Sequence, residues 1–324
     1  MSAALVLGLS SVLLAGCGSS SADSGVSVED LKVGYASDID SADVAALMGI
    51  DDLGGPDPIS ASEDSAIIAG LLSEEFHIGN ADLLSAILAK GNGADVTVIY
   101  PELMTYQYVM IAQPEIQSLD DLAGKTVAFH SPGSEDEILC RALVRQHDPE
   151  LEDKINWKVL PESPNRASAF VGGEIDATAL EFGDTLTVAE QTEFTTLGGW
   201  TDVEGASSAA IANSWVVSNK FLEENRDVVV EFVQALQKGY DEFYADKDAW
   251  MAKADEVLPD DVSTDFLAQI YDFYAEVKLY PNGEDQTLSE DRWGELNQFF
   301  MDIGQIEEPA PDDMVDFDLM SDVN

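Results

Sequence analysis

Polar side chains that could bind a small molecule directly follow four predicted strands. They occupy the segments 37–41, 79–82, 130–134 and 181–184. Because ligands of open parallel α/β sheets sit outside the carboxyl ends of the strands, the four segments are expected to border one cleft. The residues predicted to contact the ligand are Ser37, Asp38, Asp40, Asn80, Ala81, Asp82, His130, Ser131, Gly133, Ser134, Glu181 and Asp184.

Several of these residues also have a purely structural interpretation. Asp38 could cap the helix that follows it, and Asn80 could be a plain turn residue. Ser134 and Glu137 have the spacing of a capping box, and Asp184 is likewise placed to cap a helix. His130 is the member of the set that packing explains least.

The residue types favour binding over catalysis. The histidines at 77, 130 and 147 fall in separate segments without a metal-binding spacing, and the chain has no nucleophile elbow and no Walker A loop. Cys17 and Cys140 are too few for a multi-cysteine zinc site, and Cys140 is expected to be a buried apolar residue of a helix. We therefore expect no catalytic residue, no metal and no cofactor.

The charge pattern of the predicted cleft bears on the ligand. Helix N-termini attract anions, but the helix after Ser134 begins with Glu135, Asp136 and Glu137, which already complement its dipole. Arg166 is the only arginine close to a predicted cleft segment. An anion beside so many carboxylates would be costly to desolvate. The sequence thus favours a neutral or cationic solute that carries an amine or a heteroaromatic ring.

Strands and helices alternate through the first two thirds of the chain. Strands are predicted at 31–36, 76–78, 96–100, 106–111, 125–129, 155–160 and 174–180, with helical runs between them. This alternation predicts parallel α/β sheets in two lobes. The last third is helical, and its aromatic stripes within 229–243, 266–277 and 293–303 are predicted to be core.

The N-terminus has the features of an export signal. Residues 3–15 are uncharged and too few to span a membrane, which is typical of a signal-peptide hydrophobic region. The following Leu14-Ala15-Gly16-Cys17 and its polar tether resemble a bacterial lipobox, although Met1-Ser2 lacks a basic residue. The resemblance implies cleavage before Cys17 and attachment of lipid to that cysteine.

The acidic excess limits the possible partners. With 15 basic and 63 acidic side chains, the formal charge is 15 − 63 = −48. Such a chain is not expected to bind nucleic acid or to dock electrostatically on an anionic membrane. Hydrophobic residues still make up 45% of the chain, which indicates a globular protein. Because the acids are dispersed and no EF-hand loop is present, we interpret them as halophilic adaptation rather than calcium sites.

Three segments resemble a known family. They are Ser118-Leu119-Asp120-Asp121-Leu122-Ala123-Gly124-Lys125-Thr126-Val127-Ala128, Gly172-Gly173-Glu174-Ile175-Asp176-Ala177, and Trp215-Val216-Val217-Ser218-Asn219-Lys220-Phe221-Leu222. Their order and spacing resemble ABC-transporter substrate-binding proteins of the nitrate/sulfonate/bicarbonate branch, which includes taurine and pyrimidine-precursor binders. The resemblance covers roughly residues 29–305.

The resemblance implies a two-lobed α/β periplasmic-binding-protein fold of type II, a Venus flytrap, with C-terminal helices. We expect a signal peptide at 1–16, a tether at 17–28, lobe 1 from 29–108 and 214–305, lobe 2 from 109–213, and an acidic tail at 306–324. The chain should cross between the lobes near 107–113 and 209–215.

The resemblance also implies an extracytoplasmic protein that is lipid-anchored at the outer face of the cytoplasmic membrane. This protein would be a monomer that captures a small organic solute for an ABC permease and its ATPase. Two alternatives remain open. One is an enzyme on the same fold, although the pyrimidine synthase of this branch carries a cysteine cluster where this chain has only Cys140. The other is a surface lipoprotein without a transport role.

Overall fold

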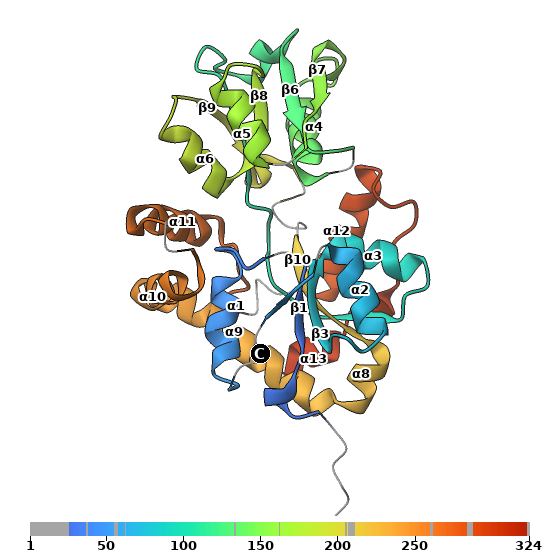
Figure 1. The fold of residues 1–324 in the computed structure, drawn as a ribbon. Coiled ribbons are helices and arrows are strands. Elements are labelled where there is room, and N and C mark those ends of the chain that lie inside the picture. Colours follow the sequence, from blue (N-terminus) through green and yellow to red (C-terminus); the bar gives the residue numbers. More distant parts are fainter. Residues whose placement is uncertain are drawn as a thin grey trace, which may run out of the picture.

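The computed structural model describes residues 26–36, 38–54, 58–61, 63–132, 134–161, 163–204, 206, 211–259, 262–283 and 288–322. The chain forms two lobes, each built around its own five-stranded sheet (Figure 1). The residues of the predicted lipobox, including Cys17, lie outside the described part of the chain. Within the described part, no helix is long and apolar enough to cross a membrane.

The first sheet belongs to the lower lobe in Figure 1 and has the order β2-β1-β3-β10-β4. Its strands are β1 Val33–Tyr35, β2 Ile59–Ser60, β3 Ile78–Asp82, β4 Val96–Pro101 and β10 Asn213–Ser218. Strands β1, β2 and β3 pair in parallel, whereas β10 runs antiparallel to both β3 and β4. This lobe is therefore completed by a strand that comes from far along the chain.

The second sheet belongs to the upper lobe and has the order β7-β6-β8-β5-β9. Its strands are β5 Tyr108–Ala112, β6 Thr126–Phe129, β7 Asn156–Val159, β8 Ala177–Glu181 and β9 Thr195–Gly199. Here β5 is the inserted strand, antiparallel to β8 and β9. The two predicted α/β sheets are thus parallel except at one inserted strand each, because the crossing segments enter the sheets from the opposite direction.

The helices cover these sheets as the alternation predicted. The upper lobe has α4 Glu135–His147, α5 Ser163–Val171 and α6 Phe182–Ala189. The lower lobe has α1 Val44–Asp51, α2 Asp64–Leu72, α3 Leu83–Gly91, α8 Asn219–Glu224, α9 Arg226–Ala245, α10 Lys247–Val257, α11 Thr264–Val277, α12 Glu290–Asp302 and α13 Phe317–Asp322. The apolar stripe of α9 is buried, as expected for a helix whose apolar residues repeat on one face.

The two crossing segments lie side by side between the lobes. They connect β4 to β5, at residues 102–107, and β9 to β10, at residues 200–212. The Ala212 N–H donates to the carbonyl of Leu103 at 2.8 Å, and the Glu102 N–H donates to the carbonyl of Asn213 at 2.9 Å. The first crossing precedes the predicted segment 107–113, because β5 already begins at Tyr108.

Residues 306–322 pack on the lower lobe and do not form the separate acidic tail that was expected. Val315 bridges Val98 of β4 in parallel, and the Arg226 guanidinium pairs with Asp316 at 2.5 Å. Met314 and Leu319 are completely buried. The reason is that apolar residues are interleaved with the acids of this segment, so its apolar side chains can pack against the lower lobe while the acids stay at the surface.

Candidate ligand-binding cleft

A cavity of about 890 Å³ lies between the two lobes. Asp82 lines it from the lower lobe, and His130, Glu135 and Glu181 line it from the upper lobe. A smaller pocket of about 160 Å³ adjoins it, with Tyr35, Ala36, Asp40, Ala42, Asp43, Asn80, Leu103, Gln107, Ala212 and Asn213 among its lining. We call these the main cavity and the inner pocket. Four residues line both, so the two spaces are neighbours: Tyr106, Tyr108, Glu135 and Glu181.

Seven of the residues predicted from the sequence line this cleft. Asp40 and Asn80 line the inner pocket, Glu181 lines both spaces, and Asp82, His130, Ser134 and Asp184 line the main cavity. The other described members of the set do not line it. Asp38 is exposed on a bend, Ala81 is buried within β3, and Ser131 donates its N–H to Ser134. Ser37 and Gly133 lie outside the described residues.

Two of the expected cleft loops are not loops. Strand β3 continues to Asp82 and β8 continues to Glu181, and a helix starts at the next residue in both cases. The reason is tertiary, because β10 pairs with β3 as far as Asp82 and β5 pairs with β8 as far as Glu181. Asn80 is accordingly a strand residue and not a turn residue.

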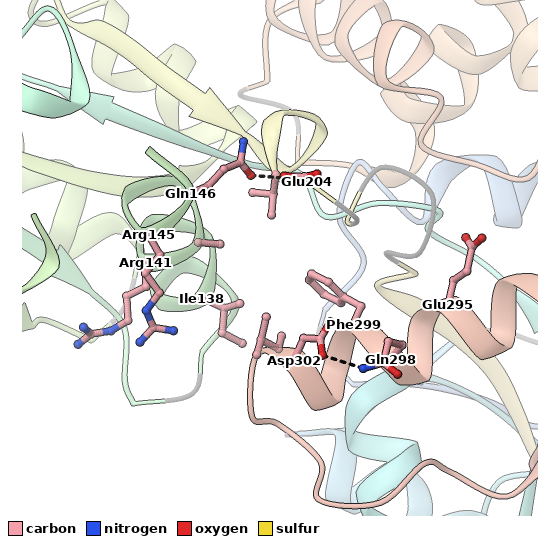
Figure 2. Close-up of a pocket in the computed structure, with 12 residues that line it drawn as sticks. Ile138, Arg141, Arg145, Gln146, Glu204, Glu295, Gln298, Phe299 and Asp302 are labelled. Atoms are coloured by element: carbon pink, nitrogen blue, oxygen red, sulfur yellow. Dashed lines mark hydrogen bonds between the residues drawn. The ribbon is translucent and has the colours of Figure 1, made fainter. Parts of the chain in front are cut away.

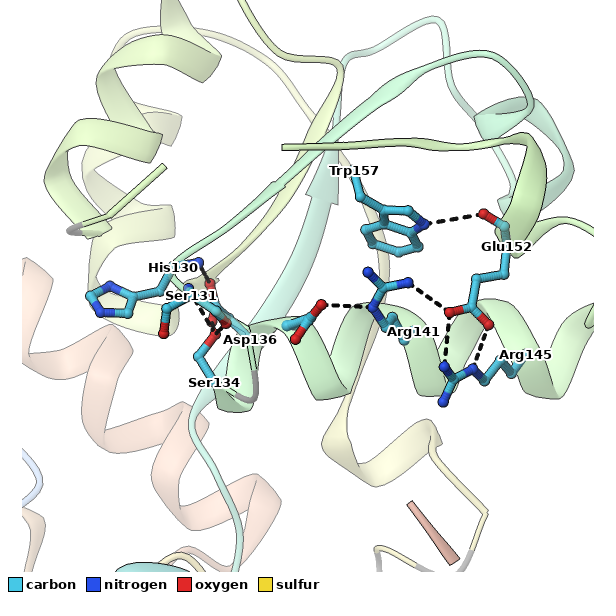
Figure 3. A network of polar contacts seen from close by, with 9 residues as sticks. His130, Ser131, Ser134, Asp136, Arg141, Arg145, Glu152 and Trp157 are labelled. Carbon is cyan, nitrogen blue, oxygen red and sulfur yellow. Dashed lines mark hydrogen bonds and ion pairs between the residues drawn. The ribbon is translucent and has the colours of Figure 1, made fainter. Parts of the chain in front are cut away.

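The loop between β6 and α4 is held by Asp136 (Figure 3). Its carboxylate accepts from the His130 N–H at 2.8 Å and from the Ser134 hydroxyl at 2.5 Å. Ser134 is the N-cap residue of α4, but its hydroxyl forms no cap bond, and Glu137 pairs with Arg141 at 2.8 Å. The predicted capping box is therefore wrong. Asp184 is not a cap either, because it lies inside the first turn of α6 and accepts from Ser163.

Arg166 is the arginine of the main cavity, and it is already neutralised. The residue is 1% exposed, and its guanidinium pairs with Asp136 at 3.1 Å and donates to the Leu160 carbonyl at 3.3 Å. A buried guanidinium needs such a partner, because an unpaired buried charge is very costly. Its positive charge is consequently not available in full to an anionic ligand.

Four helices that begin at the cleft carry an acid of their own at the N-terminus, whereas α5, which begins with Ser163, has none in its first turn. The N-cap residues of α1, α3 and α6 are Asp43, Asp82 and Glu181, and α4 begins with Glu135. The Asp82 carboxylate accepts from the Ser85 N–H at 2.7 Å. Helix N-termini commonly hold anionic ligands, but at α3 the Asp82 carboxylate already occupies that place, and acids lie at the N-termini of α1, α4 and α6 as well.

Burial shifts the acids of the cleft toward their protonated forms. It raises the pKa of Asp82 to about 6, that of Glu181 to about 7 and that of Glu102 to about 8. Burial also raises the pKa of Asp43 and of Glu135 well above the usual range, and neighbouring carboxylates add to both shifts. The main cause is that these carboxylates lose their hydration on burial, and the Arg166 charge offsets only part of this loss at Glu181.

Two residues that line the cleft, Tyr106 and Tyr108, and the neighbouring Glu102 were not predicted from the sequence. Glu102 and Tyr106 lie in the first crossing segment, and Tyr108 begins β5. Tyr106 packs on Trp200 of the second crossing, with 4.7 Å between ring centroids. The Asn80 amide donates to the Glu102 carboxylate, and the Tyr108 hydroxyl donates to Glu181 at 3.2 Å. Nothing in the local pattern marks these residues, since only the meeting of the two crossings brings them to the cleft.

A second cavity, of about 660 Å³, opens between α4 and α12 (Figure 2). Arg141 and Arg145 line it from α4, and Glu295 and Asp302 line it from α12. Both arginines pair with Glu152 (Figure 3). No group of three or more metal-ligating side chains is present in the described parts of either lobe.

A family model described as NMT1/THI5 like matches residues 59–249, which is more than half of the chain. No curated protein sequence matches the chain.

Three solved structures share the fold at low sequence identity. The ligand-binding component of an ABC-type import system from Staphylococcus aureus, solved with zinc bound, has 16% identity and a TM-score of 0.69, and the match covers 91% of this chain and 98% of that chain. The periplasmic aliphatic sulphonate binding protein SsuA from Escherichia coli has 15% identity and a TM-score of 0.67, with 88% and 90% covered. A Candida albicans gene product described as having the generic periplasmic binding protein fold has 13% identity and a TM-score of 0.58, with 90% and 94% covered. The predicted two-lobed periplasmic-binding-protein fold is thus confirmed.

Proposed function

The chain belongs to the NMT1/THI5-like family, and from this premise we propose that it is the substrate-binding component of an ABC importer. The family assignment and the fold confirm the resemblance drawn from the motifs at 118–128, 172–177 and 215–222. The protein captures a small organic solute between its lobes and delivers it to a membrane permease driven by an ATPase.

The observation that carries this proposal is a solute-sized cavity lined by both lobes. A solute in the main cavity contacts Asp82 on one side and His130 and Glu181 on the other. Binding then favours the conformation in which both lobes reach the solute, by the difference in its affinity for the open and closed forms. A permease can recognise this closed conformation and so distinguish the loaded protein from the empty one.

The proposal is tested by recovering the solute. The protein is dialysed against an extract of growth medium, and bound small molecules are identified by mass spectrometry after denaturation. We expect enrichment of one class of solute by the wild type and its loss in Ser85→Trp, because Ser85 lines the main cavity and keeps its backbone bond to Asp82. Ala189→Trp, on the exposed end of α6, is the matched control and should retain the solute. Enrichment of nothing, or retention by Ser85→Trp, contradicts the proposal.

We further propose that the mature protein is a monomer anchored through Cys17 at the outer face of the cytoplasmic membrane. The lipobox-like segment before this residue supports the anchor. Cys17→Ser removes the thiol that carries the lipid, so the protein should appear in the medium or remain unprocessed. Cell fractionation and intact-mass measurement check this result. Membrane association and mass unchanged from the wild type would rule out the anchor.

We also propose that the acidic surface is an adaptation to high salt. The net charge of −48 means that the acidic side chains repel one another in dilute buffer, which destabilises the folded state. Because the screening length falls from about 10 Å at 0.1 M salt to about 3 Å at 1 M, most of this repulsion disappears in concentrated KCl. The melting temperature should therefore rise steadily between about 0.1 M and 2 M KCl, as followed by circular dichroism. A flat or falling melting temperature over this range would refute the halophilic interpretation.

A further inference from the structure

We propose that the solute is an organic cation whose ammonium or amidinium head occupies the inner pocket. This inference rests on the proposed function, because it names the class of solute that the same cleft takes. It is carried by the chemistry of the inner pocket and by a buried polar atom there that lacks a partner.

The inner pocket is lined by acidic side chains from both lobes. Asp40 and Asp43 line it from the lower lobe, and Glu135 and Glu181 line it from the upper lobe. No lysine, arginine or histidine is among its lining residues in the described part of the chain. Four carboxylates without a cation make a strongly unfavourable site for an anion and a favourable one for a positively charged nitrogen.

One buried polar group that lines this pocket, and a carboxylate oxygen that is linked to the pocket only through Asn80, have no hydrogen-bond partner among the described residues. The Tyr35 hydroxyl belongs to a residue that is 2% exposed and lines the pocket. Glu102 is 1% exposed, and its Oε1 is unpartnered, whereas its Oε2 accepts from Asn80, which lines the pocket. Buried polar groups are almost always paired, so the Tyr35 hydroxyl indicates that a partner is missing from the pocket. An N–H of a ligand can supply that partner, because the hydroxyl oxygen accepts hydrogen bonds.

These acids differ from those that the salt adaptation explains. A solvent adaptation places carboxylates where water and salt reach them, whereas Asp43 and Glu102 are buried. The raised pKa values of Glu102 and Glu181 have burial as their largest cause, and the Arg166 charge offsets only part of it at Glu181. A bound cation would provide the missing charge and restore the ionised forms.

The sizes of the two spaces indicate where the rest of the solute lies. The inner pocket, at about 160 Å³, suits a single charged head, and the main cavity, at about 890 Å³, leaves room for a larger body. Tyr106 and Tyr108 line both spaces and Trp200 lines the main cavity, so aromatic faces border the path of the cation. An organic ion fits better than a metal, because no group of three metal-ligating side chains occurs in the described part.

Three probes of equal chain length test the sign of the charge. They are butylammonium, butylguanidinium and butanesulfonate, each at 10 mM in a buffer of constant total ionic strength. We expect the two cations to raise the melting temperature of the wild type by several degrees and butanesulfonate to leave it unchanged. A shift caused by butanesulfonate, or the absence of a shift with both cations, overturns the inference.

Variants then locate the head of the cation. Tyr35→Phe removes only the buried hydroxyl, and Glu181→Gln removes one carboxylate of the pocket and keeps its shape. Calorimetric titration with the better cation should show about a tenfold or larger loss of affinity in Glu181→Gln, because charge-assisted hydrogen bonds are strong. Tyr35→Phe should lose a few-fold. Glu190→Gln, at the end of α6 and away from the cleft, is the matched control and should bind like the wild type. Wild-type affinity in both pocket variants would overturn the placement.

The outcomes separate this inference from the proposed function. If butanesulfonate binds and Ser85→Trp abolishes its binding, the importer role stands and the cation inference fails. If cations bind equally well to Ser85→Trp and to the wild type, the cleft is not the site and both proposals fail.

Discussion

Replacing Gly239 by alanine is expected to lower the free energy of unfolding by about 2–3 kcal/mol or more, as measured by urea denaturation in concentrated KCl. Gly239 of α9 faces Gly49 of α1, and the two helices touch there through their backbones. A Cβ built at Gly239 would lie 2.2 Å from the Ala45 carbonyl oxygen and 2.6 Å from the Gly49 nitrogen. Backbone atoms cannot move aside as a flexible side chain can, so the helices would have to separate and open the core between them.

The matched control for this prediction is Gly294→Ala in the middle of α12. A Cβ at Gly294 would meet no atom within 4 Å, and the residue is exposed. Here the higher helix propensity of alanine acts without a clash and should raise the stability by about 0.5–1 kcal/mol. The same chemical change is thus expected to have opposite signs at the two sites. If Gly239→Ala were neutral or stabilising, the close approach of α1 and α9 would be refuted.

Replacing Arg166 by methionine is expected to cost about 3–5 kcal/mol of folding stability, because it strands a buried charge. The side chains of Arg166 and Asp136 are each 2% exposed, and they pair at 3.1 Å. Asp136 is held in place by the His130 N–H and the Ser134 hydroxyl, so its carboxylate would stay in the interior without a counter-ion. Methionine keeps most of the volume of the arginine stem, so little of the expected loss would come from a void.

Two further variants separate charge from packing. Arg145→Met removes an arginine that is 53% exposed and pairs with Glu152, and it should cost less than about 1 kcal/mol. Combining Arg166→Met with Asp136→Asn removes both charges and should recover a good part of the stability, because no uncompensated ion then remains. If Arg166→Met cost no more stability than Arg145→Met, the claim that Arg166 neutralises a buried carboxylate would be refuted. A double variant no more stable than Arg166→Met would refute the same claim.

Local patterns in the sequence were enough to predict the elements and their order. Hydrophobic periodicity identified the stripe of α9 and the strand–helix alternation, because these signals depend on neighbours three or four residues away, or two in a strand. Three short motifs also indicated the family, which the match over 59–249 now shows. Among the cleft residues, Asp40, Asp82 and Glu181 could be proposed from their positions near strand ends, since the parallel strands place those ends at one edge.

Only the tertiary structure decided which distant strand completes the sheet of each lobe and which residues line the cleft. The inserted strands β5 and β10 extend β8 and β3 as far as Glu181 and Asp82, through pairings between residues far apart in the chain. Tyr106 lines the cleft because two crossing segments meet there, and no local periodicity in the sequence indicates that meeting.

The distinction between surface acids and cleft acids has the same origin. A glutamate has one chemistry in the sequence, but its hydration depends on the atoms that the fold places around it. Exposed acids remain ionised in water, whereas burial raises the pKa of Glu102 to about 8. The sequence by itself therefore determined that this protein is acidic. The fold decided which of its acids are exposed to water and which are buried with a raised pKa.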